Sequence, residues 1–262
     1  MRPQKTLYHL GGGQKPLTLT QIVVRLSGPD ASGVAEACVY IFALSERVVS
    51  RGRSATVHDP EFKVAFLTAA EKAGLVALCT RALKWGGLTA TWASEALGKL
   101  CDLMVPTAAR EYVKRGHAAF IESGGPEALV GLMAMPVQQQ AFGRVWSITT
   151  AAGYAVSLFW QLSFSSPVRA RCVEVGIVPA FVRLLATAPR LAKLDADASS
   201  VTHYTRPDIV CIIATNMWED GDVFGGAKKA VLPAVLQQFV DAGFAPILVA
   251  MLEASFDEPP PG

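Results

Sequence analysis

Apolar residues recur at helical spacing in four segments of this chain, and the four segments align with one another without gaps. Each segment carries a glycine at the same place, and these glycines lie 50, 52 and 67 residues apart: Gly74, Gly124, Gly176 and Gly243. Similarity that recurs at such spacing is typical of stacked repeat proteins. We therefore expect one helical unit to recur along the chain.

Each shared glycine lies where one helix is expected to end and another to begin. The apolar pair Cys172-Val173 precedes Gly176, for example, and glycine provides the left-handed backbone that ends a helix at low cost. In three of the four segments a proline follows within three residues. Proline suits the first turn of a helix, where its missing N–H would have no partner. The pattern thus predicts a helix, a glycine bend and a second helix.

A third apolar-periodic stretch follows most of these pairs, and one more precedes the first pair. These stretches lie at 33–49, 90–104, 153–164 and 207–219. We expect units of three helices with these boundaries: a partial unit at 17–49, full units at about 62–104, 108–166 and 167–219, and a partial unit at 228–255.

The remaining parts of the chain are expected to lack regular structure. Residues 1–16 are predicted to be a flexible leader and residues 256–262 a disordered tail. The polar stretch 187–207 is predicted to be a loop, which accounts for the wider last spacing.

This arrangement resembles the armadillo repeat family, in which a short first helix, a glycine bend, a second helix and a longer third helix recur. The resemblance covers roughly residues 17–255, and its best single stretch is 172–185. It implies an all-α fold, a right-handed α-solenoid of armadillo-like three-helix repeats. It also implies that the third helices line a concave groove.

Armadillo proteins repeat a tryptophan and, four residues later, an asparagine on these third helices. The amide can bond a peptide backbone, and the indole offers a stacking wall. The corresponding pairs here, our candidate groove residues, are Phe42 and Glu46, Glu95 and Lys99, Trp160 and Phe164, and Ile212 and Asn216. The regular asparagine ladder is missing from these pairs. Trp160 and Asn216 are the foremost candidates; the alternatives are a core position for Trp160 and a local cap or helix-face role for Asn216.

The last expected unit has a first and a second helix but no third. The tail after it is rich in proline and cannot form one. Because solenoid ends normally carry polar caps, we expect this chain to associate with another protein there, end to end or in a larger complex, or to be a segment of a longer solenoid.

The composition is that of a folded chain without a strong overall charge. Of its 262 residues 51% are hydrophobic and 18% charged, which excludes intrinsic disorder. A net charge of +2 excludes recognition of polyanions by bulk charge, and no specific nucleic-acid motif is present. The uncharged stretch 145–168 is long enough to cross a bilayer, but its many hydroxyl and amide side chains favour a buried helix, so we expect no membrane span.

The cysteines are odd in number, far apart and surrounded by apolar residues: Cys38, Cys79, Cys101, Cys172 and Cys211. We expect buried free thiols, with a disulfide or metal framework as the alternative. Free thiols indicate a reducing compartment, so the chain is predicted to be intracellular and cytoplasmic, with a nuclear or organellar address as alternatives.

No nucleophile, base and orienting group can be assembled from the motifs, and no ligands stand at metal-binding spacing. We therefore expect no catalytic residue, no metal and no cofactor. The predicted function is a protein-interaction scaffold or adaptor that binds a segment of a partner protein in the concave groove. The alternatives are a non-catalytic structural subunit held in a larger assembly through uncapped ends and, third, an α-helical enzyme.

Overall fold

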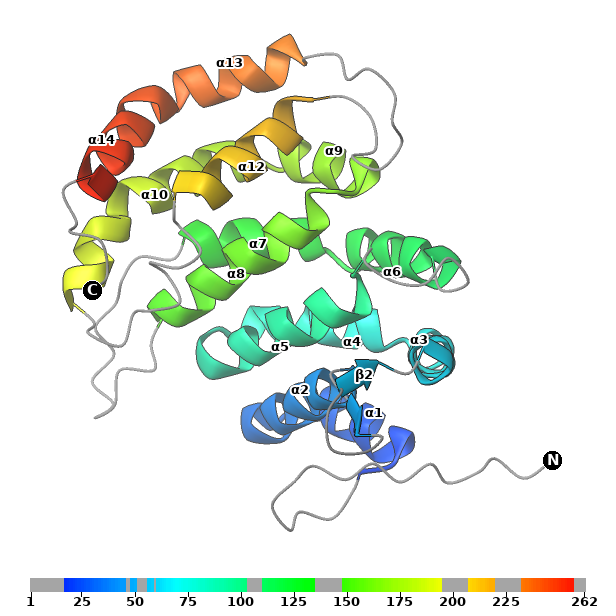
Figure 1. Ribbon diagram of the computed structural model, residues 1–262. Coiled ribbons are helices and arrows are strands. Elements are labelled where there is room, and N and C mark those ends of the chain that lie inside the picture. The colour runs from blue at the N-terminus through cyan, green and yellow to red at the C-terminus, as the bar shows by residue number, and fades with distance from the viewer. Residues whose placement is uncertain are drawn as a thin grey trace. The chain divides into compact units, whose positions relative to one another are not determined.

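Helices make up most of this protein in its computed structural model (Figure 1). The structure describes residues 17–45, 48–50, 56–58, 60–102, 110–134, 148–194, 207–219 and 232–256. The predicted all-α class is confirmed: apart from helices, this part of the chain contains only two paired strands of three residues each. The expected leader 1–16, Glu46 and residues 257–262 lie outside the described residues.

The chain forms two compact units, residues 1–125 and 126–262. The boundary falls at the first residues of α7, inside the expected unit 108–166. The first unit contains α1 (Leu19–Ser27), α2 (Ala31–Ser45), β1 (Val48–Ser50), β2 (Thr56–His58), α3 (Pro60–Lys72), α4 (Leu75–Ala82), the 3-10 helix η1 (Leu83–Trp85), α5 (Gly87–Leu100) and α6 (Arg110–Glu122). The second contains α7 (Gly125–Ala134), α8 (Ile148–Leu162), α9 (Ser166–Glu174), α10 (Ile177–Leu194), α12 (Pro207–Trp218), α13 (Pro233–Asp241) and α14 (Phe244–Phe256).

The core of the first unit lies where α4 packs against α1, α5 and α6, and where α2 runs along α5. Ile41, Leu75 and Leu97 are fully buried there, one from each of α2, α4 and α5. In the second unit the rings of Phe159 and Phe181 meet edge to face, with centroids 6.2 Å apart, and so join α8 to α10. Burial of these large apolar side chains is the main favourable contribution to both units.

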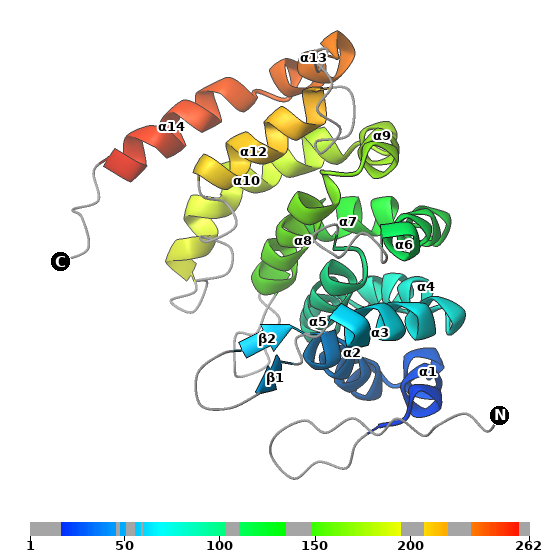
Figure 2. The ribbon, with the colours of Figure 1, turned by 45° about the vertical axis from the view of Figure 1, so that its right-hand side comes forward.

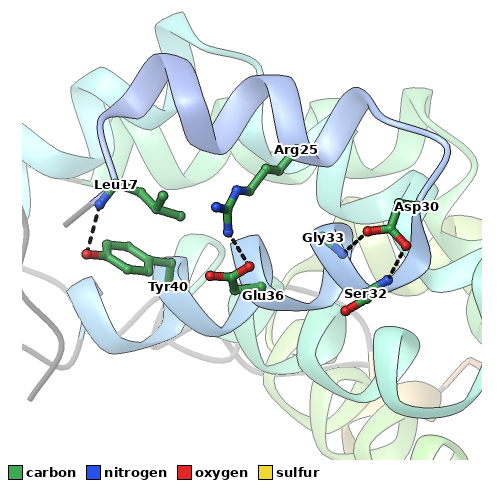
Figure 3. Close-up of polar contacts among 7 residues, drawn as sticks. All are labelled: Leu17, Arg25, Asp30, Ser32, Gly33, Glu36 and Tyr40. Atoms are coloured by element: carbon green, nitrogen blue, oxygen red, sulfur yellow. Dashed lines mark hydrogen bonds and ion pairs between the residues drawn. The ribbon is translucent and has the colours of Figure 1, made fainter. Parts of the chain in front are cut away.

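Polar contacts hold α1 against α2 (Figure 3). At one end the Leu17 N–H donates to the hydroxyl of the buried Tyr40, at 2.9 Å. Farther along, Arg25 of α1 forms an ion pair with Glu36 of α2. At the other end the carboxylate of Asp30 accepts hydrogen bonds from the first N–H groups of α2, as an N-cap residue does.

The predicted helix at 33–49 is too long, and this part of the prediction is wrong. Helix α2 ends four residues earlier, and Val48 and Val49 belong to a strand instead. They pair in antiparallel register with His58 and Val57. β-Branched residues favour extended backbone, and a short apolar run fits a helix or a strand equally well.

The predicted loop at 187–207 is also partly wrong, because α10 remains helical to Leu194. The hydroxyl of Thr187 donates to the carbonyl of Leu184 at 2.9 Å, within the helix. A threonine hydroxyl can bond back onto the preceding turn of a helix, so a threonine within a helical stretch does not have to end it. The loop was predicted from the polar residues in this stretch, and polar residues are also compatible with an exposed helix.

The uncharged stretch 145–168 is not one helix. Helix α8 ends at Leu162, and α9 begins at Ser166 after a short turn. Among the described residues no single helix combines the length and hydropathy needed to cross a bilayer; α13 and α14 reach them only together, across a bend of 68°.

The four shared glycines all have the left-handed backbone that the pattern predicted. Their φ angles are 65°, 77°, 87° and 75° for Gly74, Gly124, Gly176 and Gly243. Each lies between two consecutive helices. A Cβ built on Gly74, Gly176 or Gly243 would meet no atom within 4 Å. Glycine is therefore required there by the backbone conformation and not by lack of space.

Replacing Gly176 with alanine should lower the free energy of unfolding by about 1 to 2 kcal/mol, because a Cβ resists the left-handed conformation. Gly131 is the matched control. It is exposed inside α7, also with open space around a Cβ, so alanine there should stabilise the protein by about 0.5 to 1 kcal/mol. Urea unfolding followed by circular dichroism measures both effects. Equal effects at the two positions would contradict the helix-end assignment.

The cysteines differ in burial. Cys38, Cys79, Cys101 and Cys172 are buried, and Cys211 is half-buried. Burial raises the pKa of Cys101 and that of Cys172 to about 12. The pKa of Cys79 is also raised, first by its hydrogen bond with the thiol of Cys38 and then by burial. All four thiols are enclosed, and those of Cys79, Cys101 and Cys172 are therefore protonated at neutral pH.

A thiolate-selective reagent should accordingly label Cys211 in the folded protein first, at about pH 8, because burial slows the reaction of the other cysteines. A raised pKa slows the reaction of Cys79, Cys101 and Cys172 further. Peptide mass spectrometry locates the label. In guanidinium, as a control, all the cysteines should react. Rapid labelling of Cys101 or Cys172 in the folded chain would show that the packing around them is looser than described.

Candidate functional site

In the first unit, α2 and α5 lie side by side (Figures 1 and 2). Small buried residues of α5, Ala93 and Ala96, allow the two backbones to approach closely. The hydroxyl of Thr89 in the first turn of α5 also donates to the carbonyl of Ala31, the first residue of α2, at 3.2 Å. The two helices that were expected to line the groove of this unit are therefore fixed against each other.

Phe42, Trp92 and Lys99 form a cluster on these helices, and Glu95 stands on α5 between Trp92 and Lys99. All four are half-buried and are here named the α2–α5 face. The rings of Phe42 and Trp92 have centroids 6.0 Å apart at an interplanar angle of 56°. The ammonium of Lys99 lies 5.6 Å from the centroid of Phe42, a cation–π distance. Trp92, Glu95 and Lys99 follow helical spacing, which puts them along the same side of α5. The face thus combines two aromatic rings with charges of both signs.

The sequence prediction missed Trp92. It does not stand at the position where the resemblance to armadillo repeats places a tryptophan. Its place three residues before Glu95 could have suggested it, because residues at that spacing share a side of a helix. Its contact with Phe42 depends on the packing of two helices separated along the chain, which no local pattern indicates.

In the second unit the predicted pair of Trp160 and Phe164 lies at the C-terminal end of α8. The rings are tilted by 59°, with centroids 6.5 Å apart. Both residues are half-buried. The indole Nε1 of Trp160 is enclosed, and it has no hydrogen-bond acceptor among the described residues. Ile212, from the next candidate pair, is 41% exposed on α12.

Asn216 is buried, with 5% of its surface exposed, and so does not line an open surface. Its amide Nδ2 donates to the Ser163 hydroxyl at 2.9 Å. That hydroxyl donates in turn to the carbonyl of Trp160 at 2.6 Å. The amide therefore joins α12 to the end of α8 and is not presented to a partner, which corrects the groove role expected for Asn216.

Arg169 strengthens the same junction from α9. This arginine is 4% exposed, and its guanidinium donates to the Ser163 carbonyl at 2.8 Å and to the Glu219 carbonyl at 3.4 Å. These carbonyls lie just beyond the ends of α8 and α12, where a cation complements the negative end of a helix dipole. These hydrogen bonds satisfy the buried guanidinium, and they hold the ends of the third helices α8 and α12 together. Nothing in the local sequence marked Arg169 for this role.

Replacing Asn216 with alanine should lower the free energy of unfolding by about 1 to 3 kcal/mol, because a buried hydrogen bond is lost and a polar partner is left behind. Ile212, one turn earlier on the same helix and exposed, is the matched control. Alanine there should change stability by no more than about 0.5 kcal/mol. Chemical denaturation measures both variants. An unchanged denaturation midpoint for Asn216→Ala would contradict the buried, hydrogen-bonded position of this asparagine.

The described residues contain no group of three or more histidine, cysteine or acidic side chains that could hold a metal ion. His117 is buried, and its Nε2 lies 2.9 Å from the carbonyl of Cys101, so its ring takes part in packing α6 next to the end of α5. On the surface, Arg115 pairs with Glu71 and holds the pKa of that carboxyl below its usual range.

Neither the scan of protein-family models nor the search of curated proteins found a match to this chain. Among solved structures, a similar one is the crystal structure of an engineered protein. It matches with a TM-score of 0.58 and 15% sequence identity, over 90% of this chain and 73% of that one. At this identity the likeness concerns the fold alone, since a shared fold does not imply a shared function. The comparison therefore shows that a solved structure has a fold similar to that of this chain, and it says nothing about function.

Proposed function

We propose that this chain is a non-catalytic protein-interaction scaffold, built as a right-handed solenoid of armadillo-like three-helix repeats. The order of elements supports this architecture in both units. Helices α3, α4 and α5 follow one another around Gly74, and α9, α10 and α12 follow one another around Gly176. Stacked units of this kind offer long surfaces of adjacent helices, on which a partner segment can bind.

The α2–α5 face is the observation that carries the proposal. Its aromatic rings are only half-buried, although aromatic side chains gain most from being fully covered. Aromatic residues are enriched in the centres of protein interfaces, and polar residues form the rim around them. A partner that covers Phe42 and Trp92 removes apolar surface from water, while Glu95 and Lys99 select the charges around it.

Recognition on this surface differs from the asparagine ladder of the family. Asn216 uses its amide inside the fold, so it does not clamp a peptide backbone. Binding then depends on side chains, through stacking on Trp92 and contacts of opposite charge with Glu95 and Lys99. The matching partner segment presents an apolar side chain flanked by one acidic and one basic residue.

A second candidate function is that of a structural subunit in a larger assembly. Helices α13 and α14 expose large apolar side chains, with Leu236 39%, Val240 61% and Val249 53% exposed. Leu236 and Val240 stand one turn apart on α13, and contiguous apolar surface marks contact sites for other proteins. A subunit of this kind would bind through α13 and α14 and not through the α2–α5 face.

Affinity capture from a lysate of the source cells, read by mass spectrometry, distinguishes the two. The Trp92→Ala/Lys99→Glu variant should bind its captured partner at least about tenfold more weakly, as expected for loss of interface anchors. The Trp85→Ala/Arg110→Glu variant is the matched control, because both residues are exposed and lie outside the face. If the double variant unfolds, the single variant Lys99→Glu replaces it in the same capture experiment and should also bind the partner more weakly.

Loss of the partner from the α2–α5 variant, with the control unaffected and helicity unchanged, is the expected result. Partners retained by that variant but lost by Val240→Glu/Val249→Glu would contradict the scaffold and favour the structural subunit.

A further inference from the structure

A surface hollow in the first unit shares no residue with the α2–α5 face. It lies between α1, α4 and the end of α6, is open to solvent, and has a volume of about 570 Å³. Val23, Ala77 and Leu78 provide apolar lining, and the ionisable side chains that line it are both basic, Arg81 and Lys84. No carboxylate lines this hollow.

The two cations have no ion pair or hydrogen bond with any residue that the structure describes. Other cations of this unit do pair with carboxylates: Arg25 with Glu36, Lys63 with Asp102, Lys114 with Glu111, and Arg115 with Glu71. Glu71, which lies close in sequence to the lining residues Ala73 and Gly74, is therefore already neutralised by Arg115. The hollow keeps an uncompensated positive charge, which favours an anionic ligand.

The spacing of the lining residues narrows the class of ligand. Ala77 and Leu78 precede Arg81 by one helical turn, and Lys84 follows Arg81 by three residues. Side chains at this spacing stand about 5 to 6 Å apart on one side of a helix. In an extended peptide, alternate side chains point the same way and lie about 6 to 7 Å apart. An apolar residue followed by two acidic residues at alternate positions matches this arrangement.

We propose that this hollow is a docking site for an acidic, extended segment of a partner protein, whose apolar side chain rests on Val23, Ala77 and Leu78 while two carboxylates pair with Arg81 and Lys84. A nucleic acid fits less well, because its affinity is the sum of many contacts between phosphates and cations, and this hollow offers two cations. The site is separate from the α2–α5 face, so the chain has two surfaces of different chemistry.

The test uses the full-length chain and the fluorescently labelled peptide Leu-Ser-Glu-Ser-Glu, with Leu-Ser-Gln-Ser-Gln as its neutral counterpart. Fluorescence anisotropy should show saturable binding of the acidic peptide, with an affinity at least about tenfold above that of the neutral one. Binding should weaken as NaCl rises from about 0.05 to 0.5 M, because salt screens exposed charges.

Variants locate the site. Arg81→Glu/Lys84→Glu should weaken binding by at least about tenfold, whereas Arg110→Glu/Arg183→Glu should stay within about twofold. The second pair reverses two exposed cations elsewhere and so changes the net charge equally. Arg81→Gln/Lys84→Gln provides a milder version with the same direction of effect if charge reversal disturbs α4. Circular dichroism checks that each variant is folded.

Several results would overturn the proposal. These are no binding by the unmodified chain, equal binding of both peptides, or affinity retained by Arg81→Glu/Lys84→Glu. Tighter binding of a single-stranded oligonucleotide, lost in the same variant, would assign the hollow to phosphate instead. The Trp92→Ala/Lys99→Glu variant should bind the acidic peptide normally, which separates failure of this site from failure of the α2–α5 face.

Discussion

The left-handed backbone at four glycines is the constraint on which the rest of this structure depends. A helix that ends in this conformation turns sharply within one residue, and the next helix begins at once. Because a Cβ at Gly74, Gly176 or Gly243 would meet no atom within 4 Å, it would fit sterically but would strain the backbone. The bends therefore set where each helix pair reverses direction, and in the first unit the third helix α5 packs against α4, which begins at such a bend.

Two kinds of interaction then determine what these helices present to solvent. Apolar packing of α2 along α5 leaves Phe42 and Trp92 half-covered at the surface. In the second unit, hydrogen bonds at the ends of α8 and α12 draw Asn216 and Arg169 into the interior. The same kind of helix thus exposes an aromatic surface in one unit and buries its polar residues in the other.

Features that depend on neighbouring residues in the chain could be predicted from the sequence. The glycine bends, the helix class and the buried cysteines follow from backbone preference and apolar periodicity, which are local properties. The role of Asn216 could not be predicted, because its partner Ser163 comes from another helix. The strand at Val48 and Val49 was missed because a short apolar run fits a helix as well as a strand, and the pairing with a second strand decides between them. The hollow at Arg81 and Lys84 likewise depends on residues that only the fold brings together.

Hydrogen exchange of the chain, with and without its captured partner, tests the scaffold most directly. Mass spectrometry resolves exchange by peptide, and a bound segment slows opening of the helices that it covers. The scaffold predicts slower exchange in α2 and α5 with little change in α13 and α14. Unchanged exchange in α2 and α5, together with protection confined to α13 and α14, would contradict it.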